Sequence, residues 1–305
     1  MAQTIAISQP IAGLRTRRGN PAIGRFLRHR SAVIGAIILL FVLAVALISV
    51  AEAYIPGFPR VLATHDPLLL DPATRFTRPG ADGHILGTDN FGRDVFSRTV
   101  RGSVVSLQVG LGVSVFTVLF GTLIGLTAGF FRRLDSPLMR VMDSMMAFPG
   151  VILALAIMAA RGPSVGNVIF SLSVVYTPRL ARVVRSIVLT IRELQYVEAA
   201  NALGVSNGRI MLRHVLPNAM SPIIVQATFI FAEAVLGEAG LSFLGVGTPP
   251  DIPSWGNMLG EARAFLASAP WTMIAPGAAL MVTVLSLNLL GDGIRDLIDP
   301  RLRKQ

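Results

Sequence analysis

The sequence contains no cysteine, and it contains little charge of either sign. The lack of cysteine excludes disulfide bonds, thiol catalysis and thiolate metal sites. Only 14% of the 305 residues are charged, against about 25% in a typical soluble domain. Hydrophobic residues make up 52% of the chain, and the mean hydropathy is +0.64. A soluble protein of this composition would have too few polar side chains to cover its surface, so we predict an integral membrane protein.

Motifs for binding nucleic acid or nucleotide are also missing. The formal net charge is +10, but the arginines lie in short clusters between apolar runs, and no nucleic-acid-binding motif accompanies them. The sequence has no Walker glycine loop. We therefore expect no nucleic-acid partner, no cofactor on this chain and no metal site.

Six apolar runs approach or exceed the roughly 20 residues that a transmembrane helix needs, and they occupy residues 32–50, 103–131, 144–160, 162–178, 215–232 and 264–291. The first run follows a basic segment and precedes Ala51-Glu52-Ala53, which resembles a signal-peptide cleavage site. It is longer than the usual 7–15-residue core of such a signal. The fold class that we predict is all-α, with six membrane-spanning helices.

The positions of the basic residues set the expected orientation, because short cytoplasmic loops are enriched in Arg and Lys. With the N-terminus inside, the inner segments hold most of the 27 basic residues, whereas the outer segments are neutral. Both termini are then cytoplasmic. The expected division begins with a basic cytoplasmic segment (1–31), a first span (32–52) and an outer loop (53–102). A core of five spans follows (103–294), with a cytoplasmic loop at 190–218, and the chain ends in a cytoplasmic tail (295–305).

Two features inside the spans have alternative interpretations. Gly121, Gly125 and Gly129 form a smooth strip that suits either packing within the bundle or a subunit interface. Glu233 and Glu238 are the only carboxylates well inside a span. Because a charge there is costly, they either line a substrate path or pair with a neighbour, with Glu238 alternatively near the outer interface.

The outer segments contain turn residues and an aromatic anchor. Gly87 and Gly92, with Asp89 and Asn90, have the composition of tight turns, so we expect this part of the outer loop to be ordered against the helix ends. Trp255 is expected to sit in the aromatic belt at the membrane surface.

The polar stretch 195–218 is expected to form a helix, a turn and a second helix parallel to the membrane. Gly204 is placed as a helix C-terminal cap, Ser206 as the N-cap of the second helix, and Pro217 where the next span begins. On pattern alone, the stretch fits a helix resting on lipid headgroups as well as a contact for a cytoplasmic protein.

Several motifs resemble one family, from about Arg28 onward. EAA at 198–200 with Gly204 and Leu216-Pro217 resembles the EAA loop of bacterial ABC importer permeases. LGTDNFGRD at 86–94 resembles the signature of the dipeptide/oligopeptide/nickel branch, as do AFPG at 147–150, LSFLG at 241–245, PSWGN at 253–257 and LGDGIRD at 290–296. One departure is His214, where the family usually has Ile.

The resemblance implies a type I (MetI-like) importer permease in the bacterial cytoplasmic (inner) membrane. Its partners would be a second homologous permease, two ATPases that bind ATP and Mg, a periplasmic or lipid-anchored solute-binding protein, and membrane lipid. The EAA loop would couple to the ATPase, Glu233 and Glu238 would line the path, and three outer-loop residues would form an outer gate or binding-protein contact. The coupling residues are Glu198, Ala199, Ala200, Gly204, Leu216 and Pro217, and the outer ones are Asp89, Arg93 and Asp94.

Two other classes compete with this interpretation. An intramembrane protease would need a buried base, but all four histidines lie outside the expected spans or at an edge. A stand-alone secondary transporter usually shows internal repeats, and no clear repeat is visible. The substrate stays open among di- and oligopeptides, nickel chelates, glutathione and opine-like compounds.

Overall fold

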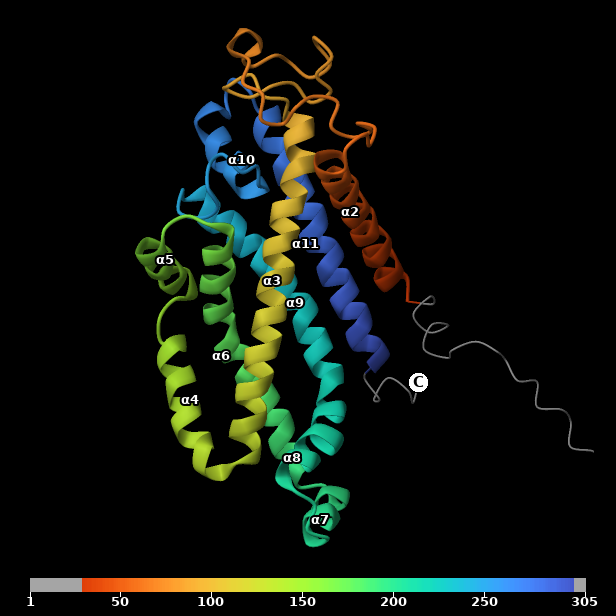
Figure 1. Ribbon diagram of the computed structural model, residues 1–305, viewed down its shortest axis with the longest axis vertical. Helices are drawn as coiled ribbons and strands as arrows, with labels where there is room; N and C mark the ends of the chain where they lie inside the picture. Colours follow the sequence, from red (N-terminus) through yellow and green to blue (C-terminus); the bar gives the residue numbers. More distant parts are fainter. Residues whose placement is uncertain (1–28, 299–305) are drawn as a thin grey trace, which may run out of the picture.

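A computed structural model describes residues 29–298, and within them the chain is helical, as the sequence predicts. Five long helices form an elongated bundle (Figure 1); they are α2 (Arg30–Tyr54), α3 (Val95–Phe130), α6 (Val165–Arg192), α9 (Leu216–Phe243) and α11 (Trp271–Ile298). Shorter helices and turns connect them: η1 (Pro72–Thr74), α4 (Arg132–Met146), α5 (Gly150–Arg161), α7 (Gln195–Ala202), α8 (Asn207–Ile210), η2 (Met211–Val215), α10 (Trp255–Ala262) and η3 (Arg263–Phe265).

Four helices are long and apolar enough to cross a membrane: α2, α3, α11, and α8 joined through η2 to α9. The pair α4 and α5 makes a fifth if the two are one bent span, since they meet at 88°. Helix α6 is long but carries Arg179, Arg182, Arg185 and Arg192, and it is not among the apolar spans. The described residues therefore show four or five apolar spans and not the six expected.

The expected span at 144–160 is not one helix. Helix α4 ends at Met146, and Pro149 stands at the N-cap of α5. The residue before a proline is disfavoured in the helical region, and proline has no N–H to donate. The chain therefore turns at residues 147–149, and the prediction of a continuous helix was wrong.

The boundaries of three other spans also differ from expectation. The span expected at 162–178 belongs to α6, which continues to Arg192. Helix α3 begins at Val95 because the Asp94 carboxylate accepts a hydrogen bond from the Ser97 N–H at 2.7 Å and caps the first turn. Residues 95–102 are thus helical, and the non-helical part of the expected outer loop ends at Asp94. The last long helix begins at Trp271, directly after Pro270, and not at residue 264.

The glycine strip packs inside the bundle. A Cβ on Gly125 would lie 2.6 Å from the Ala181 carbonyl oxygen and from the Val184 Cβ. Gly121 and Gly129 meet Leu180 and Val188 of α6 in the same way. The strip is therefore where α3 and α6 approach closely, which confirms internal packing over a subunit interface.

The two ends of the bundle are built differently (Figure 1). One end carries the loop before α3 together with α10, and the opposite end carries α7 and α8. His29 Nε2 lies 2.9 Å from Asp296 Oδ2, so the start of α2 and the last turn of α11 lie together. The expected terminal segments, apart from residues 29–31 and 295–298, lie outside the described residues.

Candidate functional site

Helix α7 presents two distinct faces. Val197 and Ala200 are buried against the main apolar cluster of the bundle, whereas Glu198 and Ala199 are exposed. Burial of one face fixes the rotation of this two-turn helix, because a helix too short to be stable alone depends on tertiary packing. Glu198 is thereby held outward, on the surface at the end of the molecule.

Gly204 ends α7 in the left-handed conformation, with φ of +74°. The Gly204 N–H donates to the Asn201 carbonyl at 3.0 Å, and the Val205 N–H donates to the Ala200 carbonyl at 3.1 Å. This pair of bonds is the Schellman motif. A Cβ at Gly204 would meet nothing within 4 Å, so the backbone angle and not space requires glycine. The predicted cap is confirmed.

The second helix of the loop differs from expectation. Ser206 occupies the N-cap of α8, but its side chain makes no capping hydrogen bond. Helix α8 continues through the π-helical turn η2 into α9, with Leu216 and Pro217 in the first turn of α9. Pro217 has no N–H to donate, and it directly follows the π-helical turn η2 and Leu216, so the helix runs on through the irregular turn. The second segment is thus an extension of α9 and not a separate helix.

The solvent-exposed surface of residues 195–212 carries several large apolar side chains. Leu203 is 84% exposed, and Tyr196 and Leu212 are also exposed. Beside them lies a basic groove of about 550 Å³, lined by Phe130, Phe131, Arg132, Arg133, Leu134, Arg192, Asn201 and Asn207. Exposed apolar residues rimmed by charge mark an interaction surface. We call residues 195–212 the coupling surface.

The two carboxylates of α9 lie in different environments. Glu233 Oε1 accepts from Arg179 Nη1 at 2.7 Å, and Glu233 lines a groove of about 410 Å³ with Tyr176, Leu236 and Gly150. Arg179 and Tyr176 were not among the predicted site residues, because only the packing of α6 against α9 brings them to Glu233.

Glu238 is 0% exposed and does not line that groove. Its carboxylate accepts hydrogen bonds from Ser106 Oγ at 3.1 Å and Ser242 Oγ at 2.8 Å. A partner is therefore present for each glutamate, as the cost of an intramembrane charge requires. Of the two, only Glu233 faces open space in this structure.

The outer residues Asp89 and Arg93 are buried and paired. Arg93 Nε donates to Asp89 Oδ2 at 2.6 Å, and its guanidinium also binds Glu261 of α10. Arg98 Nη2 donates to the same Glu261 at 3.3 Å. This ion-pair cluster joins the loop, α3 and α10, and it does not lie on the surface. No pattern in the sequence indicated a role for Arg98 and Glu261, because the two residues meet only in the tertiary structure.

Asp94 is likewise buried, with its carboxylate shared between the helix cap and His84. The loop around it is ordered, as expected. Gly92 takes a φ of +77°, and a Cβ there would lie 1.7 Å from the Asp71 carbonyl oxygen.

Trp255 is not an interfacial anchor. It is 1% exposed, and its Nε1 donates to the Thr99 carbonyl of α3 at 2.9 Å. The tryptophan fixes α10 against α3, and the prediction of a membrane-surface position was wrong.

Residues 118–304 match the family described as binding-protein-dependent transport system inner membrane component. This chain belongs to that family. It is accordingly a multi-pass permease component of the cytoplasmic membrane, as the resemblance of its motifs implied.

Relatives of this permease match it over most of their length. The chain is 45% identical to a putative peptide transport system permease protein of Brucella abortus, over 92% of this chain and 91% of that protein. It is 41% identical to the dipeptide transport system permease protein DppC of Alkalihalophilus pseudofirmus, over 90% and 88%. It is 36% identical to the glutathione transport system permease protein GsiD of Pectobacterium atrosepticum, over 92% and 90%.

His214, the departure from the usual family pattern, is accommodated within the permease. Its ring lies 6.3 Å from the ring of Tyr196. Asn218 Nδ2 donates to the Tyr196 hydroxyl at 3.2 Å and to the His214 carbonyl at 2.6 Å. Asn218 thus ties α7 to the turn before α9, and because it binds the backbone of residue 214, the bond does not depend on the histidine side chain.

Proposed function

We propose that this chain is the permease subunit of an ATP-driven importer for di- or oligopeptides. Relatives named for peptide and dipeptide transport support this substrate class. A relative named for glutathione transport supports glutathione as the alternative substrate. Nickel chelates and opine-like compounds are two further alternatives.

The importer would contain a second homologous permease, two ATPases and a solute-binding protein, which is periplasmic or lipid-anchored. ATP and Mg would bind the ATPases, because this sequence has no phosphate-binding glycine loop. The permease would catalyse no reaction and would form half of the path across the membrane.

Six spans with both termini in the cytoplasm are the topology that we propose. Helix α6 supplies the sixth span despite its arginines, since three of them are paired: Arg179 with Glu233, Arg182 with Asp143 and Arg185 with Asp135. Charged residues in spans are tolerated when they are paired and face the bundle or a wet cavity. The contact of His29 with Asp296 supports placing both termini on one side, and the basic groove beside α7 supports placing that end inside.

The coupling surface is the observation that carries the proposal. Glu198 lies on α7, which is anchored by buried residues, and Leu203 follows at the C-cap of that helix. After the turn at Gly204 the chain continues through α8 and η2 into α9. A push on α7 by an ATPase would therefore reach a membrane-spanning helix directly. A helix resting on lipid would not need this rigid connection.

The groove beside Glu233 is the segment of the path that we assign to the substrate. Glu233 and Arg179 present one charge of each sign, both partly exposed. A zwitterionic peptide carries the complementary pair, a terminal carboxylate and a terminal amine. Because exposed ion pairs are weak, each partner can exchange the other for substrate at little cost.

The experiment is uptake of labelled dialanine by cells whose own copy of this gene is replaced by variants. We expect Glu198→Arg to assemble but to lose uptake by at least about tenfold, because reversing a charge that contacts a partner costs 2 kcal/mol or more. Glu193→Arg, also exposed at this end but outside α7, is the matched control. Normal uptake with Glu198→Arg would contradict the proposal, and equal loss in both variants would indicate a general charge effect.

A further inference from the structure

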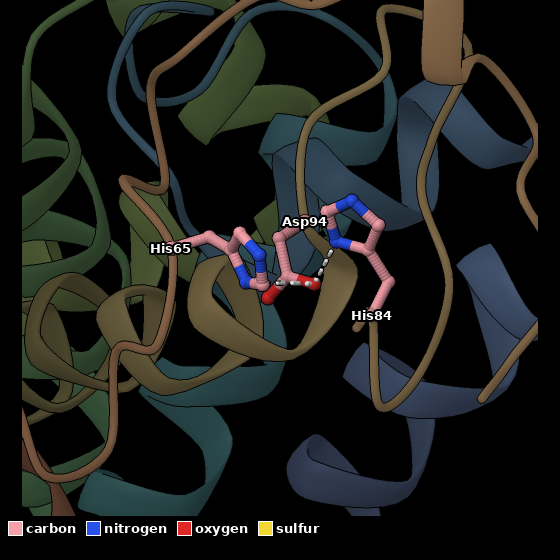
Figure 2. Close-up of side chains that lie close together, drawn as sticks. All are labelled: His65, His84 and Asp94. Carbon is pink, nitrogen blue, oxygen red and sulfur yellow. Dashed lines mark hydrogen bonds and ion pairs between the residues drawn. The ribbon is translucent and has the colours of Figure 1, made fainter. Parts of the chain in front are cut away.

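The outer loop brings two histidines and one aspartate together. His84 Nδ1 lies 2.8 Å from Asp94 Oδ1, and His65 Nδ1 lies 4.0 Å from the same oxygen. One ligand atom of each residue lies within 4.8 Å of the other two. Figure 2 shows both imidazole rings directed at the Asp94 carboxylate. The three residues come from separate turns of the loop and from the start of α3.

The surrounding hydrogen bonds hold these side chains in place. Asp94 Oδ2 accepts from the Ser97 N–H at 2.7 Å, which leaves Oδ1 facing the two rings. The His65 N–H donates to Ser97 Oγ at 3.3 Å, which fixes the loop beside the same helical turn. The two rings lie 4.4 Å apart. Thr64 Oγ1 lies 3.1 Å from His65 Nδ1 and is its nearest polar neighbour in the loop. A carboxylate oriented by a hydrogen bond, as Asp94 is, is typical of metal sites.

Charge and access at the cluster also suit a cation. Asp94 and His84 are buried, whereas the His65 side chain is 37% exposed and leaves an approach from solvent. Arg93 and Arg98 lie nearby in sequence, but both guanidiniums are bound to Asp89 and Glu261. The positive charges are thus neutralised by other carboxylates, and the Oδ1 atom of Asp94 faces the two histidines.

We propose that His65, His84 and Asp94 bind one Zn²⁺ ion. Zinc takes imidazole nitrogen and carboxylate oxygen at roughly 2.0–2.2 Å in tetrahedral geometry, so its ligand atoms lie about 3.4 Å from one another. The atoms observed at 2.8 and 4.0 Å reach that spacing by small side-chain rotations. Water on the exposed side of His65 completes the coordination.

The ion would join the loop to α3. His65 and Asp94 are far apart in sequence, and the backbone N–H of His65 already donates to the Ser97 hydroxyl in the first turn of α3. The sequence gives no sign of this site, because His65, His84 and Asp94 do not follow any recognised ligand spacing. This proposal replaces the expectation, made from the sequence, that the chain holds no metal site.

The test is zinc stoichiometry of the full-length, tag-free protein in detergent, measured by elemental analysis after dialysis against Zn²⁺. We expect one zinc per chain in the unaltered protein and in His29→Ala, whose histidine pairs with Asp296 away from the cluster. We expect His65→Ala to lose it. His65 is half-exposed, so this substitution leaves the fold intact. Asp94→Asn also loses zinc, while its amide oxygen still caps α3.

A second measurement separates a specific ion from surface binding. Zinc at about 100 times its Kd should raise the ratio of folded to unfolded protein about 100-fold, and this gain should vanish in His65→Ala. Absence of zinc from the unaltered protein, or equal zinc in His65→Ala and in the unaltered protein, would overturn the proposal. The three side chains would then form only a hydrogen-bonded cluster.

Discussion

The two ends of this permease use polar residues in opposite ways. At the end with α10, Asp89, Arg93 and Asp94 are buried and bound to partners within the chain. At the end with α7, Glu198 and Leu203 are exposed to solvent. The first set builds tertiary structure, whereas the second lies on the surface, where we propose that an ATPase binds. Motif residues at the two ends thus have different physical roles, although they look alike in the sequence.

The largest effect is expected from breaking the buried cluster. Arg93→Ala leaves the Asp89 carboxylate with two backbone N–H donors and, as its charged partner among the described residues, Arg98 at 3.7 Å. Removing one partner of a buried ion pair costs about 3–5 kcal/mol. Arg182→Ala, which breaks the exposed pair with Asp143, should cost at most ~1 kcal/mol. Thermal unfolding of the two variants in detergent compares them directly. Equal shifts in Tm would remove the distinction between the buried ion-pair cluster and an exposed ion pair.

At the turn of the coupling surface we expect a smaller change in the free energy of unfolding but a large loss of uptake. Gly204→Val forces a β-branched residue into the left-handed region, at a cost of about 1–2 kcal/mol, and should misplace α7. Gly204→Asn tolerates that region better and is the matched control. Dialanine uptake should fall in the valine variant and persist in the asparagine variant. If both transport normally, the turn does not position the coupling surface.

The smallest effect is expected at Trp255. Trp255→Phe removes the hydrogen bond to the Thr99 carbonyl while keeping an aromatic ring, which costs about 1 kcal/mol. The Tm should fall slightly, and uptake should be unchanged, because the residue only fixes α10 against α3. A large loss of uptake with an unchanged Tm would assign Trp255 to transport instead.

Local backbone chemistry was predictable from the sequence. Gly204 was expected as a cap and Gly87 and Gly92 as turns, because glycine reaches positive φ at no steric cost, and all three adopt it. The helical character followed from the apolar runs. The close approach of α3 to α6 was foreseen only as one of two alternatives for Gly121, Gly125 and Gly129.

Features that depend on distant residues were not predictable. Burial of Arg93 requires Glu261, which lies in α10 far along the chain, and no local pattern reports that pairing. Trp255 was assigned to the membrane surface because composition cannot show the Thr99 carbonyl that receives its N–H. The bend at Pro149 was missed because the apolar run continues through it, so hydropathy alone indicates a straight span.

The central claim is that the coupling surface is covered by an ATPase, and the cysteine-free sequence allows a direct measurement. Leu203→Cys introduces a single thiol at the most exposed leucine of α7's turn, and Leu69→Cys places a control thiol in the outer loop. We predict that maleimide labels both thiols in the permease alone, and that assembly with the ATPase of its transport system protects only the thiol at position 203. Equal labelling of that thiol with and without the ATPase would contradict the claim.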